Sequence, residues 1–191
     1  ISEVMWAGSV KNDGTWDPTD VFIEVRNEGS RPLNLSGWHL DMRGTREVGY
    51  ILPETDRKVD VGEHVIFAAK DTGCFPNADF ILKGLEFSFN DAFYLTLRDR
   101  DEHLIESGGS RSVEPFAGGY DLVRARSMER VELMFGGRGT DPHAWHHYND
   151  GEVDKPNNDL VAENCNQRTL ASPSRANSPD YSGAFASGSL E

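Results

Sequence analysis

The chain has 191 residues, enough for one substantial domain that holds together by burial alone, without a metal ion or a disulfide. Ten Phe, four Trp and five Tyr are too many aromatic residues for a disordered acidic chain, so most of it should be globular. Thirty-two Asp and Glu against nineteen Lys and Arg give a formal net charge of −13, which argues against a nucleic-acid partner. Such a charge suits a divalent cation, a cationic peptide or simple solubility.

Neither end of the sequence shows a targeting or membrane segment. No run approaches the roughly 18 consecutive apolar residues that a spanning helix needs, so we expect no transmembrane segment. The chain opens on a strand-like run without an initiator Met, which is typical of a mature or trimmed chain that has lost a signal segment. At the other end, Leu190-Glu191 resembles a cloning scar.

Apolar and polar residues alternate through the first hundred positions, as they do in half-buried strands. Val21, Ile23 and Val25 share one face of such a strand, and the residues between them point the other way. Further strands are predicted at 37–42, 63–69, 79–82, 92–98 and 102–106. Short strands separated by turn residues predict a β-sandwich or barrel, and the lack of a helical period predicts little helix.

The character of the sequence changes near residue 107, where Gly and Pro become frequent. Only 120–124 and 129–135 are strand-like beyond that point, which predicts a loop-rich region. Its aromatic residues, Trp145 and Tyr148 among them, indicate that it packs on the rest of the fold. After about residue 171 the chain is small, polar and Pro-punctuated, which predicts an extended segment.

Three segments of the first half resemble motifs of the lamin-tail domain family, in that family's order. Residues 1–9 (Ile-Ser-Glu-Val-Met-Trp-Ala-Gly-Ser) resemble its opening strand, and residues 22–27 (Phe-Ile-Glu-Val-Arg-Asn) its second strand. Residues 33–40 (Leu-Asn-Leu-Ser-Gly-Trp-His-Leu) match the signature Leu-x-Leu-x-Gly-Trp-x-Leu, the most specific of the three. The motif positions are Glu3, Trp6, Glu24, Asn27, Ser36, Gly37 and Trp38.

The resemblance implies an all-β fold, an immunoglobulin-like β-sandwich of the lamin-tail type with a loop-rich C-terminal extension packed on it. Residues 171–177 resemble the family's closing Pro-Gly-x-x-Asn segment, with Ser174 in place of Gly. The expected parts are 1–106 as sandwich core, 107–170 as loop-rich insertion, 171–189 as closing extended segment and 190–191 as cloning scar. Because many bacterial members are exported, the resemblance implies a secreted, periplasmic or cell-envelope protein.

The two cysteines, Cys74 and Cys165, form no Cys-x-x-Cys pair, so neither a zinc knuckle nor a thioredoxin-type site is indicated. In an exported protein they can close a disulfide across a long loop. Two buried free thiols are the alternative.

Two carboxylates in the motif strands also admit two interpretations. Glu3 and Glu24 occupy corresponding places and could face each other, as paired carboxylates do in some hydrolases. Alternatively, each accepts hydrogen bonds from backbone or hydroxyl groups at a sheet end. The lamin-tail resemblance favours this structural role.

A dense group of metal-ligand side chains lies between residues 141 and 154. Its candidate ligands are His143, His146, His147, Asp150, Glu152 and Asp154. Imidazole and carboxylate together suit zinc or iron, and the three acids alternate as the first ligands of a calcium loop do. The His-Glu-x-x-His pattern is missing, and Lys155 and Val161 stand where an EF-hand needs Gly and Glu. A looser calcium site and a loop anchored by Trp145 remain the alternatives.

No sequence pattern for a catalytic nucleophile or a phosphate-binding loop is present. The sequence therefore predicts a non-catalytic extracellular or cell-envelope module that binds a protein or another envelope component. It predicts no enzymatic activity and no cofactor apart from the calcium candidate, and it leaves the oligomeric state open. One alternative is a small metal-dependent hydrolase with its site in 141–159, and another is the accessory domain of a larger secreted nuclease or phosphatase.

Overall fold

The computed structural model describes residues 1–44, 46–131, 137–149 and 165–180. Over these residues the regular structure is almost entirely β-strand, with one short 3₁₀ turn, η1 (Pro142–Ala144). The all-β class predicted from the alternating pattern is therefore confirmed. No helix in this part of the chain is long and apolar enough to cross a membrane.

The larger of two main sheets has six strands in the order β14-β13-β1-β4-β7-β8. They are β14 (Trp145–His147), β13 (Met128–Arg130), β1 (Glu3–Met5), β4 (Phe22–Arg26), β7 (His64–Ala68) and β8 (Phe80–Ile81). All neighbours pair antiparallel except β7 and β8, which are parallel. Because β13 and β14 lie beyond residue 106, this sheet combines strands from the expected core with strands from the expected insertion.

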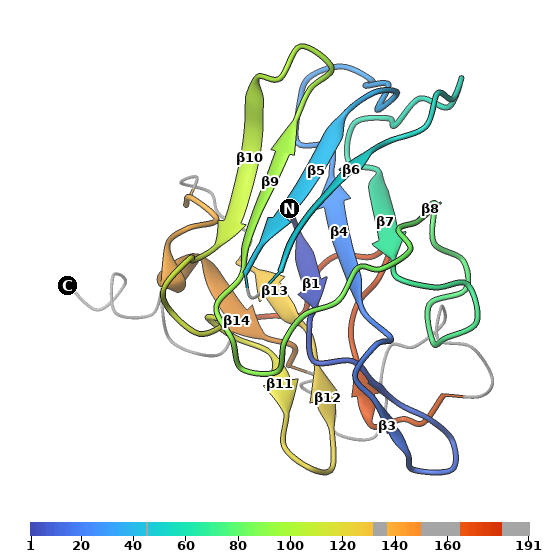
Figure 1. Ribbon diagram of the computed structural model, residues 1–191, viewed down its shortest axis with the longest axis vertical. Helices are drawn as coiled ribbons and strands as arrows, with labels where there is room; N and C mark the ends of the chain where they lie inside the picture. Colours follow the sequence, from blue (N-terminus) through green and yellow to red (C-terminus); the bar gives the residue numbers. More distant parts are fainter. Residues whose placement is uncertain (45, 132–136, 150–164, 181–191) are drawn as a thin grey trace.

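The second main sheet has four antiparallel strands in the order β10-β9-β5-β6. They are β10 (Leu104–Gly109), β9 (Tyr94–Arg98), β5 (His39–Arg43) and β6 (Glu47–Ile51). Two small sheets lie at one end of the molecule (Figure 1). Their strands are β11 (Gly119–Tyr120), β12 (Ala125–Arg126) and β15 (Thr169–Leu170) in one, and β2 (Ser9–Val10) and β3 (Trp16–Asp17) in the other.

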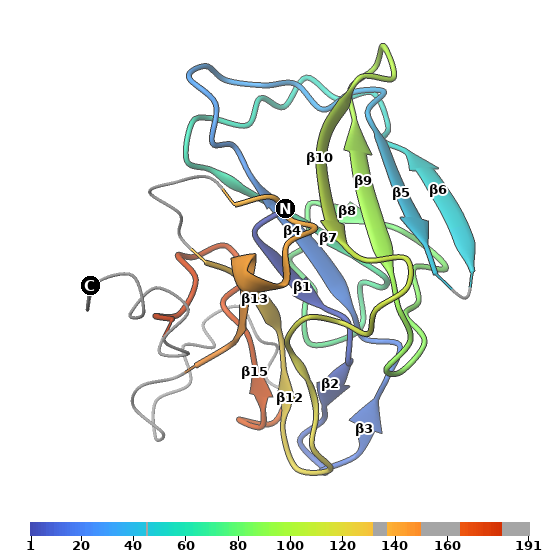
Figure 2. The same ribbon diagram turned by 90° about the vertical axis from the view of Figure 1, so that its left-hand side faces the viewer.

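The two main sheets enclose one hydrophobic core. Figure 2 shows β5, β6, β9 and β10 apart from β1, β4 and β13. Val4 and Ile23 from the six-stranded sheet and Leu40 and Leu95 from the four-stranded sheet belong to the same cluster, each at most 1% exposed. Burying each such side chain contributes about 1.5 to 3 kcal/mol. Val21, Ile23 and Val25, which the alternating pattern places on one face of a strand, all belong to this core.

The other face of the six-stranded sheet carries a second apolar cluster. Met5 and Phe22 on this face pack with Phe75 and Ala171, which come from a loop and from the C-terminal part of the chain. A strand buried on both faces needs cover on both sides. The central strands of this sheet are therefore enclosed between the main core and segments that are remote in sequence.

The motif positions lie at turns and in the core. Gly37 has a φ of +70°, a conformation that favours glycine, and it delivers the next residue, Trp38, into the main core. Ser36 Oγ donates a hydrogen bond of 2.8 Å to a backbone carbonyl of the facing loop. Asn27 Nδ2 donates to two backbone carbonyls at 3.0 Å, and the Trp6 indole N–H donates to another at 2.8 Å.

One predicted strand is wrong. The segment 120–124 is the tip of a hairpin, because Asp121 Oδ1 accepts the N–H groups of Val123 and Arg124 at 3.0 and 2.7 Å and turns the chain. Of the strand predicted at 129–135, β13 covers the beginning, and 132–136 lie outside the described residues.

Candidate functional site

Three glutamates lie side by side in the six-stranded sheet, on the face away from the main core. Glu3 on β1 pairs in register with Glu24 on β4 and with Glu129 on β13. All three are fully buried. The corresponding places of Glu3 and Glu24 in the motif strands allow them to face each other, whereas Glu129 joins them only because the fold places β13 beside β1. We call these three residues the glutamate row.

The closing segment, defined here as residues 171–178, supplies hydrogen bonds to the whole row. Each carboxylate accepts one of its backbone N–H groups: Ser172 to Glu3 Oε1 (2.9 Å), Ser174 to Glu24 Oε2 (2.5 Å) and Ser178 to Glu129 Oε2 (3.1 Å). The hydroxyls of Ser172 and Ser178 also donate to Glu129. The row therefore fastens the C-terminal part of the chain to the sheet.

No Lys or Arg forms an ion pair with the glutamate row within the described residues. Burial raises the pKa of Glu3 well above its ordinary value, and the charges of Glu129 and Glu24 raise it further. Burial also raises the pKa of Glu129. His64 Nδ1 lies 2.7 Å from Glu24 Oε1, and His146 Nε2 lies 3.8 Å from Glu129 Oε2. The folded protein therefore holds protons here at pH values where exposed glutamates are ionised.

This arrangement does not suit hydrolysis. A catalytic carboxyl group must come within hydrogen-bond reach of a substrate. Here the backbone and hydroxyl groups of the closing segment occupy the carboxylate oxygens. The contacts favour the structural role over a catalytic pair.

The three candidate metal-binding histidines do not converge. His146 is buried, with Nδ1 2.9 Å from a backbone carbonyl oxygen, while the neighbouring His147 accepts the Gly118 N–H at its Nδ1 at 2.9 Å. Successive residues on a strand point to opposite faces, so these two side chains diverge. His143 is exposed on η1. The acidic candidates lie outside the described residues: Asp150, Glu152 and Asp154.

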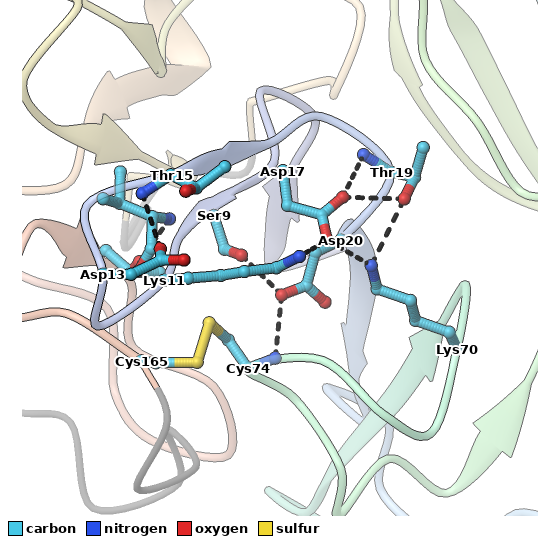
Figure 3. Close-up of polar contacts among 12 residues, drawn as sticks. Ser9, Lys11, Asp13, Thr15, Asp17, Thr19, Asp20, Lys70, Cys74 and Cys165 are labelled. Carbon is cyan, nitrogen blue, oxygen red and sulfur yellow. Dashed lines mark hydrogen bonds and ion pairs between the residues drawn. A yellow bond between two sulfur atoms is a disulfide. The ribbon is translucent and has the colours of Figure 1, made fainter.

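Cys74 and Cys165 are joined in a disulfide with their Cα atoms 5.6 Å apart (Figure 3). Asp20 lies beside it, and its Oδ2 accepts Ser9 Oγ at 2.5 Å and the Cys74 N–H at 2.7 Å. Burial raises the pKa of Asp20. Asp20 and the two sulfurs are the only group of three potential metal ligands among the described residues, but disulfide sulfurs offer no thiolate to a metal.

A neighbouring carboxylate, Asp17, is neutralised by two lysines (Figure 3). Its Oδ2 lies 3.1 Å from Lys11 Nζ and 2.7 Å from Lys70 Nζ. Burial would raise the pKa of Asp17, but hydrogen bonds from Lys70, Thr19 and Lys11 outweigh it and hold that pKa well below its ordinary value. Asp17 and Asp20 are thus committed to contacts within the chain.

A pocket of about 530 Å³ lies between the β11–β12 hairpin and β14. We call it the hairpin pocket. Most of its lining residues are polar or charged, with charges of both signs, and they include Tyr120, Asp121, Arg124, Arg126, His147 and Asp180. Sequence reasoning missed this site. The available signal is the Arg-Ala-Arg spacing of 124–126, which places two arginines on one side of a strand.

The tip of the same hairpin is unusual in backbone and in exposure. Leu122 has a φ of +70°, in the left-handed region that a leucine rarely adopts, and it is 85% exposed. Val123 beside it is 48% exposed. Two apolar side chains therefore project from this end of the molecule.

Comparison with known sequences identifies no relative: no family model matches the chain, and no curated protein matches it.

Proposed function

We propose that this protein is a non-catalytic binding module of the lamin-tail type, exported from the cell, and that it binds another protein through the tip of the β11–β12 hairpin. The observation that carries the proposal is Leu122, which is both strained and exposed. Strained backbone at a non-glycine residue persists where the surroundings enforce it, and it concentrates at functional sites.

The turn chemistry shows why Leu122 is unexpected. The Asp121 N–H donates to the Arg124 carbonyl at 3.2 Å, so Leu122 and Val123 are the two central residues of a hairpin turn. Hairpin turns of this kind strongly prefer Gly, Asn or Asp where φ is positive. A leucine there costs about 1 to 2 kcal/mol relative to the right-handed conformation. Neither the local backbone nor the core gains from it.

Binding of Leu122 in an apolar pocket of a partner protein would offset the free energy of this strained backbone. Transferring one leucine from water into such a pocket contributes about 1.5 to 3 kcal/mol. A membrane surface is less suitable, because anionic lipids repel a chain of net charge −13.

The lamin-tail assignment draws support from the closing segment. Ser174 has a φ of +61° at the position where the family has Gly, so this position needs the conformation that glycine adopts most easily. The Gly37 turn and the buried Trp38 agree with the family's signature. The disulfide supports export, because such bonds persist mainly in oxidising compartments.

The test is site-specific photo-crosslinking in an envelope and secreted extract of the source cells. A photoreactive residue at Leu122 should trap one discrete partner, whereas the same residue at Val61, which is 55% exposed, should not. Leu122→Gly should abolish capture by a probe at Val123 while leaving the melting temperature equal or higher, because Gly accepts the positive φ.

Two results would count against the proposal. One is equal capture by the original chain and by Leu122→Gly. The other is a Leu122-dependent attachment to protein-free lipid vesicles, which would make the tip a membrane anchor.

A further inference from the structure

Two arginines in the hairpin pocket have no partner within the described part of the chain. Arg124 and Arg126 are each half-buried, and neither guanidinium group has a hydrogen bond or an ion pair there, although both charges act on nearby Asp121. Two other half-buried arginines do form ion pairs: Arg26 with Glu28 and Arg98 with Asp41. A partly desolvated guanidinium without a partner loses hydrogen bonds that water would otherwise supply. The arrangement therefore suits an external anion.

The chain from Arg124 through β12 places both arginines on the side of the hairpin pocket. Ala125 lies between them, fully buried in the second apolar cluster, so its neighbours on either side point the opposite way. Both arginines line the hairpin pocket, whose volume of about 530 Å³ is within the range of small-molecule sites. The pocket can hold a whole small ligand and not only a single ion.

His147 contributes a neutral donor to the same pocket. Its Nδ1 accepts the Gly118 N–H at 2.9 Å, which leaves the proton of the neutral ring on Nε2. Burial and the charge of Arg126 lower the pKa of His147 and so favour this neutral form at physiological pH. The site then offers two cations and one neutral N–H group.

The acidic residues of the pocket decide which anion fits. Asp121 and Asp180 line it too. Asp121 accepts the Arg124 and Val123 N–H groups on Oδ1. These hydrogen bonds and the nearby charges of Arg126 and Arg124 lower the pKa of Asp121, so it is ionised, and its Oδ2 receives neither of the two N–H groups. These carboxylates would repel a phosphate dianion more strongly than a singly charged carboxylate. A singly charged carboxylate also pairs well with a planar guanidinium.

We propose that the hairpin pocket binds an organic carboxylate that also carries amino or hydroxyl groups, with Arg124 and Arg126 holding the carboxylate and Asp121 accepting from the donor groups. A free hydroxy or amino acid and the C-terminus of a peptide share this chemistry. The site does not depend on Leu122 and stands or falls separately from the proposed function.

The experiment is a titration of the ¹⁵N-labelled full chain followed by NMR, with the Gly118 and Gly119 amides as reporters. The probes are lactate, glycine, the dipeptide Gly-Gly, its C-terminal amide, and inorganic phosphate. We expect saturable shifts with lactate, glycine or Gly-Gly, and no saturation with the amide. A clear preference for Gly-Gly over glycine and lactate identifies a peptide end, and the reverse identifies a free acid.

Variants connect the shifts to the arginines. Arg126→Gln should weaken binding at least tenfold, and Arg124→Gln with Arg126→Gln should remove saturation. Arg43→Gln, at an exposed arginine on β5, is the matched control and should bind as the unaltered chain does. If the double variant loses its dispersed spectrum, the single variants and Arg126→Lys decide the question, since Lys keeps the charge without the planar fork.

Three results would overturn the assignment: no saturable shift with any carboxylate, tighter binding of phosphate than of every carboxylate, or equal weakening by Arg43→Gln and Arg126→Gln.

Discussion

At the scale of single residues, the glutamate row sets how stability should depend on pH. Glu3 and Glu129 have pKa values above the ordinary glutamate value of 4.5 in the folded state, so folding takes up protons. The stabilisation from this uptake is complete below pH 4.5 and is lost as pH rises through the folded-state pKa values. The slope is about 1.4 kcal/mol per pH unit for each proton involved.

Glu3→Gln should flatten that pH dependence. The amide keeps an acceptor for Ser172 and removes one titrating group, so the fall in unfolding free energy between about pH 5 and 8 should shrink. Urea unfolding across this range measures it. Glu47→Gln, on an exposed side chain of β6, should leave the slope unchanged. An unaltered slope in Glu3→Gln would show that Glu3 does not hold a proton.

Ser174 provides a second test at this scale. Its φ of +61° costs a serine roughly 1 kcal/mol, and glycine adopts this conformation freely. Ser174→Gly keeps the N–H that bonds Glu24 and should raise the unfolding free energy by about 0.5 kcal/mol, after the greater freedom of glycine in the unfolded chain is subtracted. Ser172→Ala, which removes hydroxyl bonds to Glu3 and Glu129, should lower it. Thermal and urea unfolding of both variants give the two signs.

At the scale of elements, the disulfide connects a loop to the C-terminal part of the chain. Cys74 and Cys165 are 91 positions apart, and closing so long a loop stabilises a fold by about 4 to 5 kcal/mol in the chain-entropy model. Replacing both cysteines by Ala should therefore lower the urea midpoint strongly. The unaltered chain under reducing conditions should behave like that variant. Equal midpoints with and without reductant would mean that the bond does not stabilise the fold.

Sequence reasoning succeeded for elements whose pattern is local. Alternation in β4 placed Ile23 and Val25 on a common face, which lies in the core, and the Gly37-Trp38 pair identified a turn into the core. It failed at 120–124, because a single side chain, Asp121, bends a segment that otherwise looks extended. The lesson is that turn chemistry at one residue can override an alternating pattern over five.

At the scale of the whole molecule, the parts that could not be predicted are those that depend on contacts between remote segments. Glu129 joins Glu3 only through the pairing of β1 with β13, and the hairpin pocket forms only where β14 approaches the β11–β12 hairpin. Neither contact leaves a periodic signal in the sequence. The candidate metal ligands His146 and His147 are a different case: they are neighbours on β14, and their side chains point to opposite faces of that strand.

The glutamate row also affects how this protein can change during evolution. Its three carboxylates accept backbone N–H groups of the closing segment, and every residue except proline has such a group, whatever its side chain. Much of residues 171–178 can therefore drift while Glu3, Glu24 and Glu129 must stay. Divergent homologues should be recognisable by three acids on three adjacent strands long after the rest of the sequence has changed.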